Sequence, residues 1–310
     1  MTAAPSLNLR AAFASIAVAL LLLGLKAFAV WSTRSTAMLG SLADTALDLV
    51  ASLATLVGVW IAAMPADEDH RFGHGKAEAL AAILQVMLIS ISAFGLALRA
   101  VQQWLAGQRT VQAEDGIVVS GVAMAATLAL LAYQRFVIAR TGSVAIATDH
   151  VHYQSDLLLN LAVIAALALD QYAEVGGADP VFALAIAGWL ARSAWRASQA
   201  AIEQLMDREW PDEKRHRFVA LAARHPELEH LHDLRTRTSG NRDFAQFHVK
   251  LPGEMTVAQS HAIIERVEAD LCRYFPRLEL LIHIDPEGHV DEPDNPLAEA
   301  NEFERLEAKR

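Results

Sequence analysis

Long apolar runs alternate with short polar connections over the first two thirds of the chain. A helix that spans a bilayer needs about 20 predominantly apolar residues. Six runs reach that length, at approximately 11–31, 38–63, 79–105, 114–138, 143–169 and 178–204. Charged and turn-forming residues fill the connections, such as MPADEDHRFGHGK after the second run. The pattern predicts an α-helical membrane domain of six transmembrane helices over residues 1–207.

The pattern changes after Asp207, where charged residues become frequent. The stretch PDEKRHRFVALAARHP predicts an amphipathic helix, and alternation predicts two strands, HLHDLRTRTSG and DFAQFHVKL, joined by Gly240 and Asn241. A second helix and a third strand, LELLIHIDP, complete an αββαβ domain over residues 208–290. Residues 291–310 are charged and contain proline, so we expect a disordered tail.

Composition supports a membrane part followed by a soluble part. Hydrophobic residues make up 54% of the chain and the mean hydropathy is +0.26, which is high for a soluble protein. The formal net charge of −10, without a basic stripe, argues against a nucleic-acid partner. Cys272 is the single cysteine, which excludes an internal disulfide and a cysteine-rich zinc site.

The distribution of basic residues predicts the orientation. Six spans place both termini on one side of the membrane. That side carries Arg10, Arg71, Lys76, Arg135, Arg140, Arg192 and Arg196. The other side carries Arg34, Arg99 and Arg109. Because cytoplasmic loops are enriched in Lys and Arg, we expect the richer side, and therefore both termini, to be cytoplasmic.

Two predicted spans carry paired ionisable residues. Asp44 and Asp48 lie four residues apart in the second span, and His152 and Asp156 repeat this spacing in the fifth span, within TDHVHYQSD. The spacing puts both members of a pair on one helix face. A carboxylate at the bilayer centre costs at least about 2.5 kcal/mol, so these groups should face a cavity and share a cation. Three carboxylates and one imidazole suffice for a tetrahedral Zn²⁺ site.

A structural role for these charges is the main alternative. Asp44 could pair with Lys26 of the first span instead of binding a metal. Two such pairs on separate helices favour the metal interpretation. Asp149 and His150 lie on other faces of the fifth helix, and we assign them no ligand role.

Two further clusters lie outside the spans. The loop PADEDHRFGHGKAE contains Asp67, Glu68, Asp69, His70 and His74. These side chains could hold a second cation or could simply be solvated. The predicted αββαβ domain contains His230, His232, His248, His261, His283 and Asp285. His283 and Asp285 share a face of the third strand, which favours a metal site there, binuclear and at a subunit interface.

These motifs resemble those of the cation diffusion facilitator family, in particular its bacterial zinc- and iron-efflux branch. The resemblance extends from the first span to about residue 290 and rests on SLADTALD, PADEDHRFGHGKAE, TDHVHYQSD, HLHDLRTRTSG and IHIDP. It implies proton-coupled export of divalent cations by alternating access across the bacterial inner membrane. It also implies a V-shaped homodimer whose cytoplasmic domains have a metallochaperone-like fold.

The resemblance also implies four sets of functional residues. The transport site is Asp44, Asp48, His152 and Asp156. The loop site is Asp67, His70 and His74. The binuclear cytoplasmic site is His232, His248, His261, His283 and Asp285. The ion pair of the hinge is Lys76 and Asp207. His230 receives no role.

These observations predict a metal–proton antiporter and not an enzyme, because the chain lacks a motif such as H-E-x-x-H. Zn²⁺ suits the Asp₃His set and is also the expected structural metal of the cytoplasmic domain. Cd²⁺ would fit by analogy, and Fe²⁺ or Mn²⁺ stays open. His152 is the expected proton carrier, since histidines titrate near neutral pH. A metal sensor without transport and a passive channel are the alternatives.

Overall fold

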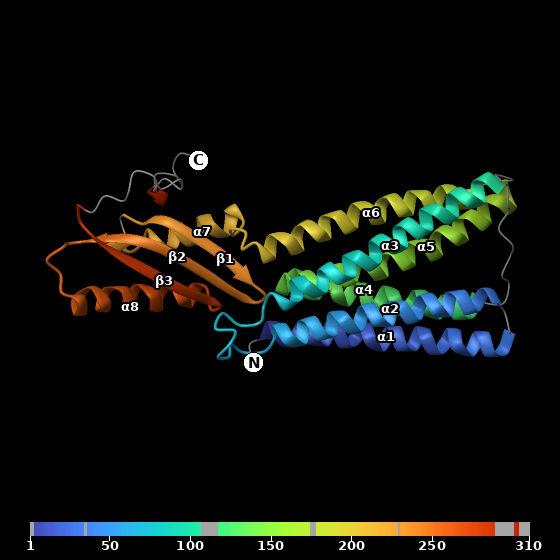
Figure 1. Cartoon of the computed structure of the whole chain (residues 1–310), viewed down its shortest axis with the longest axis horizontal. Helices are drawn as coiled ribbons and strands as arrows, with labels where there is room; N and C mark the ends of the chain where they lie inside the picture. The colour runs from blue at the N-terminus through green and yellow to red at the C-terminus, as the bar shows by residue number, and fades with distance from the viewer. Residues whose placement is uncertain are drawn as a thin grey trace. The chain divides into compact units, whose positions relative to one another are not determined.

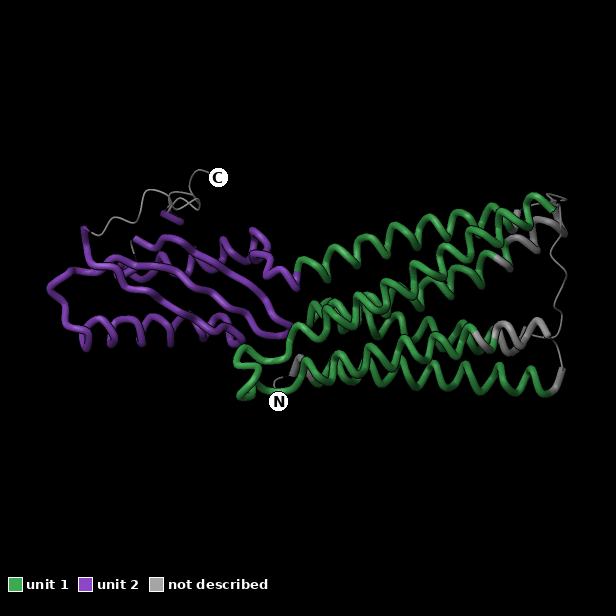
Figure 2. Tube along the Cα trace, viewed as in Figure 1, with its two compact units in different colours: residues 1–203 green, residues 204–310 purple. Residues whose placement is uncertain are grey.

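The computed structural model describes residues 3–33, 36–106, 117–173, 178–228, 230–288 and 301–303. The chain divides into two compact units, residues 1–203 and 204–310, coloured green and purple in Figure 2. The division predicted after Asp207 lies close to this boundary.

The described residues of unit 1 form six long helices, α1 to α6, labelled in Figure 1. Their bounds are α1 Ala3–Thr33, α2 Thr36–Ala62, α3 Ala77–Ala106, α4 Ile117–Thr141, α5 Val144–Ala173 and α6 Ala178–Leu205. Each predicted span overlaps one of these helices, and the largest difference in an end is at the start of α1. By length and composition, four helices of the described chain could cross a membrane: Ser6–Trp31, Asp44–Ala62, Ala77–Ala106 and Gly121–Thr141.

Small residues allow the helices of unit 1 to approach closely. Ala11 and Ala12 of α1 are fully buried in a cluster with Val59 of α2, Val137 of α4 and Ile146 of α5. A Cβ atom added to Gly58 of α2 would lie 2.3 Å from Cβ of Ala81 in α3. Close backbone approach at small residues is how helices pack in membranes, where the hydrophobic effect does not drive their association.

A second apolar cluster joins α6 to the bundle. It contains Val86, Ile89 and Ala93 of α3 and Ile186, Leu190 and Ala194 of α6. Partly buried residues of α5, including Val151 and Leu158, pack against it. Helix α5 therefore contacts several other helices of the bundle. These contacts hold the residues of the candidate site that α5 carries.

Unit 2 has the predicted αββαβ order. Its elements are α7 Asp212–Ala222, a 3₁₀ turn Pro226–Leu228, β1 His232–Ser239, β2 Arg242–Leu251, α8 Val257–Tyr274 and β3 Leu278–Pro286. Gly240, at φ 57°, and Asn241 form the two-residue connection of the β1–β2 hairpin. β3 pairs parallel to β2, with α8 as the crossover that a parallel pair requires. Thr256 and Gln259 form a capping box at the start of α8.

Alternate residues of the strands point to a core that both helices cover. Phe247 of β2 and Leu280 of β3 are buried there with Phe218 of α7 and Leu271 of α8. Val257, at the start of α8, is exposed. Because both helices cover one face of the sheet, the opposite face is available for polar side chains.

Residues 301–303 lie against unit 2. Phe303 packs on the apolar core, the Glu302 amide donates to the Leu231 carbonyl oxygen at 3.1 Å, and Arg215 of α7 pairs with Glu302 at 2.6 Å. This order differs from the disorder expected for 291–310; the rest of that tail lies outside the described residues.

Candidate metal centres

Three ionisable residues meet between α2 and α5 in unit 1. The Nε2 atom of His152 lies 3.0 Å from Oδ1 of Asp48 and 3.9 Å from Oδ2 of Asp156. His152 is buried, and the two aspartates are half-buried. One ligand atom from each residue lies within 4.8 Å of the others. Ligands about 2.0–2.2 Å from a tetrahedral Zn²⁺ are separated by roughly 3.4 Å, so small side-chain shifts would accommodate the ion.

Asp44 lies outside this group in the structure. Its side chain is exposed one helical turn before Asp48, and the described cluster consists of Asp48, His152 and Asp156. The Lys26 ammonium of α1 donates to the Thr45 hydroxyl at 2.6 Å, next to Asp44 in sequence. Asp44 as a fourth ligand therefore stays a prediction, and it would require its side chain to move inward.

Sequence reasoning missed a network of polar residues beside the intramembrane group. Asp149, fully buried on α5, accepts hydrogen bonds from Ser15, Gln85 and Gln134. Ser15, Gln85 and Gln134 are polar residues inside otherwise apolar spans, which is a signal that sequence alone offers. Their convergence on one carboxylate depends on how four helices pack, which sequence reasoning did not reach.

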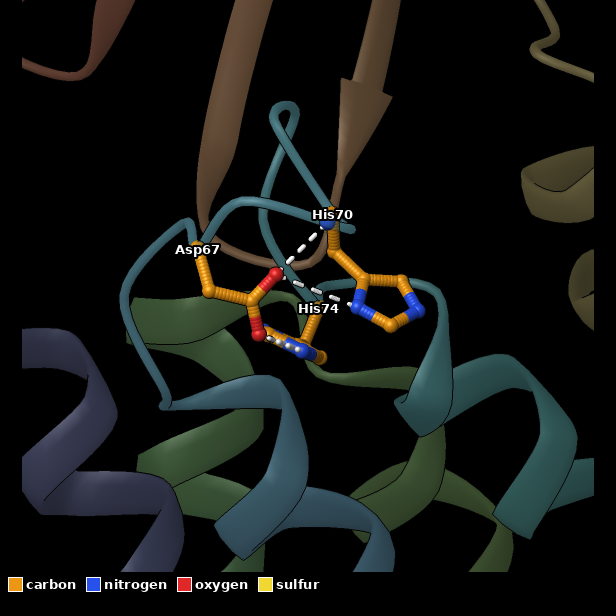
Figure 3. Close-up of side chains that lie close together, drawn as sticks. All are labelled: Asp67, His70 and His74. Carbon is orange, nitrogen blue, oxygen red and sulfur yellow. Dashed lines mark hydrogen bonds and ion pairs between the residues drawn. The ribbon is translucent and has the colours of Figure 1, made fainter.

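The loop between α2 and α3 brings its three predicted ligands together, as Figure 3 shows. Oδ1 of Asp67 lies 3.3 Å from Nδ1 of His70, and Oδ2 of Asp67 lies 3.2 Å from Nε2 of His74. The two imidazole rings have centroids 4.5 Å apart. Gly73, at φ 80°, supplies the left-handed backbone that turns the loop back between the histidines. The spacing D-x-x-H-x-x-x-H thus folds into one cluster.

Backbone groups prepare this loop cluster for a cation. The His70 amide donates to Asp67 Oδ1 at 2.6 Å, and this hydrogen bond is the main cause that lowers the pKa of Asp67. Nδ1 of His74 lies 3.2 Å from the Pro65 carbonyl oxygen. Since a carbonyl oxygen only accepts, His74 donates through Nδ1, and its Nε2 atom faces Oδ2 of Asp67. Asp67 therefore offers an ionised carboxylate beside the Nε2 atom that would bind a metal.

Three histidines form one row across the sheet of unit 2. His232 of β1 pairs in register with His248 of β2, which pairs with His283 of β3. Adjacent strands lie about 4.8 Å apart, so the three rings are neighbours. Ring centroids are 5.5 Å apart for His232 and His248 and 4.6 Å apart for His248 and His283. The row lies on the sheet face opposite the apolar core.

Asp285 completes this cluster. Its Oδ2 atom lies 3.4 Å from Nε2 of His232 and 3.0 Å from Nδ1 of His248, and its Oδ1 atom lies 3.3 Å from Nε2 of His283. The Nδ1 atom of His232 donates to the His230 carbonyl oxygen at 2.7 Å, which leaves Nε2 as the ligand atom. Two imidazoles and a carboxylate fit a Zn²⁺ ion with one coordination position left open.

The remaining predicted residues lie apart or in different units. His261 is exposed on α8, and no described contact joins it to the cluster around Asp285. Lys76 belongs to unit 1 and Asp207 to unit 2, so their pairing stays a prediction. Asp207 pairs with Arg237 at 3.3 Å within unit 2. Asp233, which sequence reasoning missed, lies 3.9 Å from Nε2 of His248.

Comparison with known families gives two matches that together cover most of the chain. Residues 12–206 match the cation efflux transmembrane domain. Residues 210–287 match the cytoplasmic domain of cation efflux proteins. The boundary between the two matches agrees with the boundary between units 1 and 2 within a few residues.

Individual relatives extend over nearly the whole length. The cation-efflux pump FieF of Klebsiella pneumoniae subsp. pneumoniae is 41% identical over 296 residues, which cover 96% of this chain and 97% of that protein. FieF of Cronobacter sakazakii is 43% identical over 277 residues, covering 89% of this chain and 92% of that protein. The solved zinc form of CzrB is 33% identical, covers 27% of this chain and 97% of its own, and has a TM-score of 0.24.

Proposed function

Because this chain belongs to the cation efflux family of membrane transporters, we propose that it exports Zn²⁺ from the cytoplasm in exchange for protons. The meeting of Asp48, His152 and Asp156 between α2 and α5 carries this proposal. Placing ionisable residues within membrane-spanning helices costs free energy, and such residues mark ion pathways when they face one another. Metal cation efflux is the activity of the family; the metal and the coupling ion are proposed here.

The donor set supports zinc as the cargo. Two carboxylates and one imidazole, with Asp44 available one turn away, make a set of oxygen and nitrogen ligands that suits tetrahedral Zn²⁺. Cd²⁺ would fit the same ligands. Fe²⁺ and Mn²⁺ prefer more oxygen ligands and bind more weakly to a given site of this kind. We therefore rank zinc first and iron or manganese as the alternative.

The exchange of zinc for protons follows from the chemistry of the ligands. His152 can bind a metal only in its neutral form, and the aspartates only as carboxylates, so binding displaces protons. When the site faces the outside, protonation of the same groups would release the cation. Nε2 of His152 lies 3.0 Å from Asp48 and 3.9 Å from Asp156, and this position between the two carboxylates would make it the central proton carrier of the group. An inward proton gradient would then drive zinc outward by alternating access.

The cytoplasmic unit gives the proposal a regulatory part. Unit 2 corresponds to the family's dimerisation domain, and we propose a homodimer in the bacterial inner membrane with both termini cytoplasmic. His232, His248 and Asp285 would hold a structural Zn²⁺, whose charge would offset the carboxylate among these rings. His283, largely exposed beside Asp285, would serve a second ion together with His261. Cytoplasmic metal would thereby stabilise the dimer.

Flux measurements on purified protein in proteoliposomes test the proposal. Zinc on the cytoplasmic face should cross only weakly without a pH gradient and should be transported strongly with one. Fe²⁺ and Mn²⁺, supplied in parallel, should move more slowly. Zinc flux that ignores the pH gradient would indicate a channel. Zinc binding without any flux would indicate a sensor.

A further inference from the structure

A buried carboxylate close to the transport group has no role in the mechanism above. Asp149 lies on α5, three residues before His152, and is fully buried. Its Oδ1 atom accepts from Nε2 of Gln85 in α3 at 2.7 Å. Its Oδ2 atom accepts from Oγ of Ser15 in α1 at 2.6 Å and from Nε2 of Gln134 in α4 at 2.7 Å. Side chains of three other helices therefore converge on one group.

The donors at Asp149 are neutral and are themselves buried. Ser15 and Gln134 are fully buried, and Gln85 is 1% exposed. The NH₂ group of a glutamine only donates, so both oxygens of Asp149 are arranged as a carboxylate requires. These hydrogen bonds satisfy the oxygens without cancelling their charge. In surroundings of low dielectric constant, such a charge acts strongly on groups one helical turn away.

His152 is the functional group on that next turn. Residues three apart on a helix have Cβ atoms about 5–6 Å apart. The same turn is fixed again to α1 and also to α2, because the Tyr153 hydroxyl bonds to the Ser15 carbonyl oxygen at 3.0 Å and to the Ser52 hydroxyl at 2.9 Å. Asp149 and Tyr153 together connect α5 to α1, α2, α3 and α4. The rotation of α5, and with it the direction of His152, is set by these bonds.

We propose that Asp149 is a positioning residue for the transported cation. Its fixed negative charge raises the affinity of Asp48, His152 and Asp156 for a divalent cation, and its hydrogen bonds hold His152 toward Asp48. The inference rests on the proposed function, since it assumes that these three residues bind the cargo. Groups that support metal ligands in this way typically change metal affinity by about 10–100-fold.

Glu78 offers a matched control within the same bundle. It is a buried carboxylate at the start of α3 that accepts from Asn8 at 3.0 Å and from Ser143 at 2.7 Å. Glu78 precedes Gln85 by seven residues, which is about 10 Å along the helix. It lies on the side of Asp149 away from His152. Glu78→Gln therefore removes a similar buried charge at a greater distance from the cation.

The test is the zinc dissociation constant of the full-length protein in detergent, measured by isothermal titration calorimetry. His74→Ala and His248→Ala are introduced first, so that the loop and cytoplasmic clusters do not contribute. In this background Asp149→Asn should raise the dissociation constant by about 10–100-fold. Glu78→Gln should change it by less than about threefold. Equal effects of the two variants, or a change of less than about threefold for Asp149→Asn, would overturn the inference.

Two more variants keep the result decisive. Gln85→Lys places an ammonium beside the Asp149 carboxylate and should raise the dissociation constant as Asp149→Asn does. If Asp149→Asn does not fold, an unchanged constant in Gln85→Lys overturns the inference. Asp48→Asn separates the two claims: if it abolishes binding while Asp149→Asn changes the dissociation constant by less than about threefold, only the inference fails. If Asp48→Asn also leaves binding unchanged, the proposed function fails with it.

Discussion

At the scale of single residues, two of the three candidate centres orient a histidine in the same way. In both, a histidine donates through Nδ1 to a backbone carbonyl oxygen: His74 to Pro65 and His232 to His230. The donated proton fixes the tautomer and leaves Nε2 for a cation. In the cluster of Asp48, His152 and Asp156, Nε2 of His152 faces both aspartates. Each of these centres thus has a prepared nitrogen ligand next to a carboxylate.

The loop cluster gives a prediction about pH. The hydrogen bond from the His70 amide lowers the pKa of Asp67, so this carboxylate stays ionised until the pH falls below its ordinary range. Protonation of Asp67 therefore does not contribute to any loss of loop metal between about pH 8 and pH 6. Asp67→Asn should weaken zinc binding at the loop by more than about tenfold at each pH between about 6 and 8, because the carboxylate that it removes is ionised throughout that range.

The measurement is zinc binding at several pH values in a variant that lacks the cytoplasmic cluster. Glu68→Gln is the control, because Glu68 is an exposed neighbour outside the described cluster. A loss that is confined to the upper end of this pH range would contradict the prediction, because it would mean that Asp67 is already protonated at the lower end.

Single residues also show how much of the candidate site can be predicted from the sequence. The i, i+4 pairs identified Asp48, His152 and Asp156, which the structure brings together, but they treated Asp44 and Asp48 alike. The two aspartates differ because the rotation of α2 against α5 sets which of them faces His152. Asp149 was excluded as a ligand from its position on the helix. Its partners on three other helices could not be inferred from α5 alone.

At the scale of helices and strands, the contact between α2 and α3 depends on a glycine. A Cβ at Gly58 would meet Cβ of Ala81 at 2.3 Å, closer than such atoms approach. Gly58→Ala should therefore destabilise unit 1 by about 1–3 kcal/mol, although alanine favours helices. Gly95→Ala in α3, where nothing lies within 4 Å, should be neutral or stabilising by up to about 1 kcal/mol. Thermal unfolding in detergent compares them, and equal melting temperatures would contradict this account.

The docked segment 301–303 gives a prediction for unit 2. Arg215 and Glu302 are both largely buried, at 15% and 7% exposure of their side chains. Glu302→Ala would leave the guanidinium without this carboxylate, and unit 2 should lose about 3 kcal/mol of unfolding free energy. Urea denaturation measures the loss. A loss below about 0.5 kcal/mol, as for an ordinary surface substitution, would mean that the segment does not stabilise the unit.

The positions of the strands of unit 2 could be predicted from the sequence, whereas the register between the strands could not. Alternation of apolar residues, with Gly240 and Asn241 between two runs, located the hairpin. The row of His232, His248 and His283 needs a further fact, the parallel register of β3 beside β2. That register depends on the length and packing of the α8 crossover. The sequence therefore predicted a histidine cluster in this domain but not the alignment of the row, and His261, which the prediction included, lies outside the described cluster.

At the scale of the whole molecule, the two units divide the work. Among its described residues, 3–33, 36–106, 117–173 and 178–203, unit 1 holds one intramembrane cluster of possible ligands, formed by Asp48, His152 and Asp156. Unit 2 holds the row of His232, His248 and His283. Unit 1 matches the transmembrane domain of cation efflux proteins, and unit 2 matches their cytoplasmic domain. The division implies that loss of the histidine row should affect regulation and dimer stability more than the pathway itself.

The central claim is that zinc crosses the membrane through Asp48, His152 and Asp156. The most direct test is the initial rate of zinc transport into proteoliposomes under an imposed pH gradient, for the unmodified protein, Asp48→Asn and His283→Ala. The account predicts that Asp48→Asn reduces the rate by about 100-fold or more, because a cation ligand and a charge are lost inside the membrane, while His283→Ala retains transport. A rate in Asp48→Asn close to that of the unmodified protein would show that zinc takes another path.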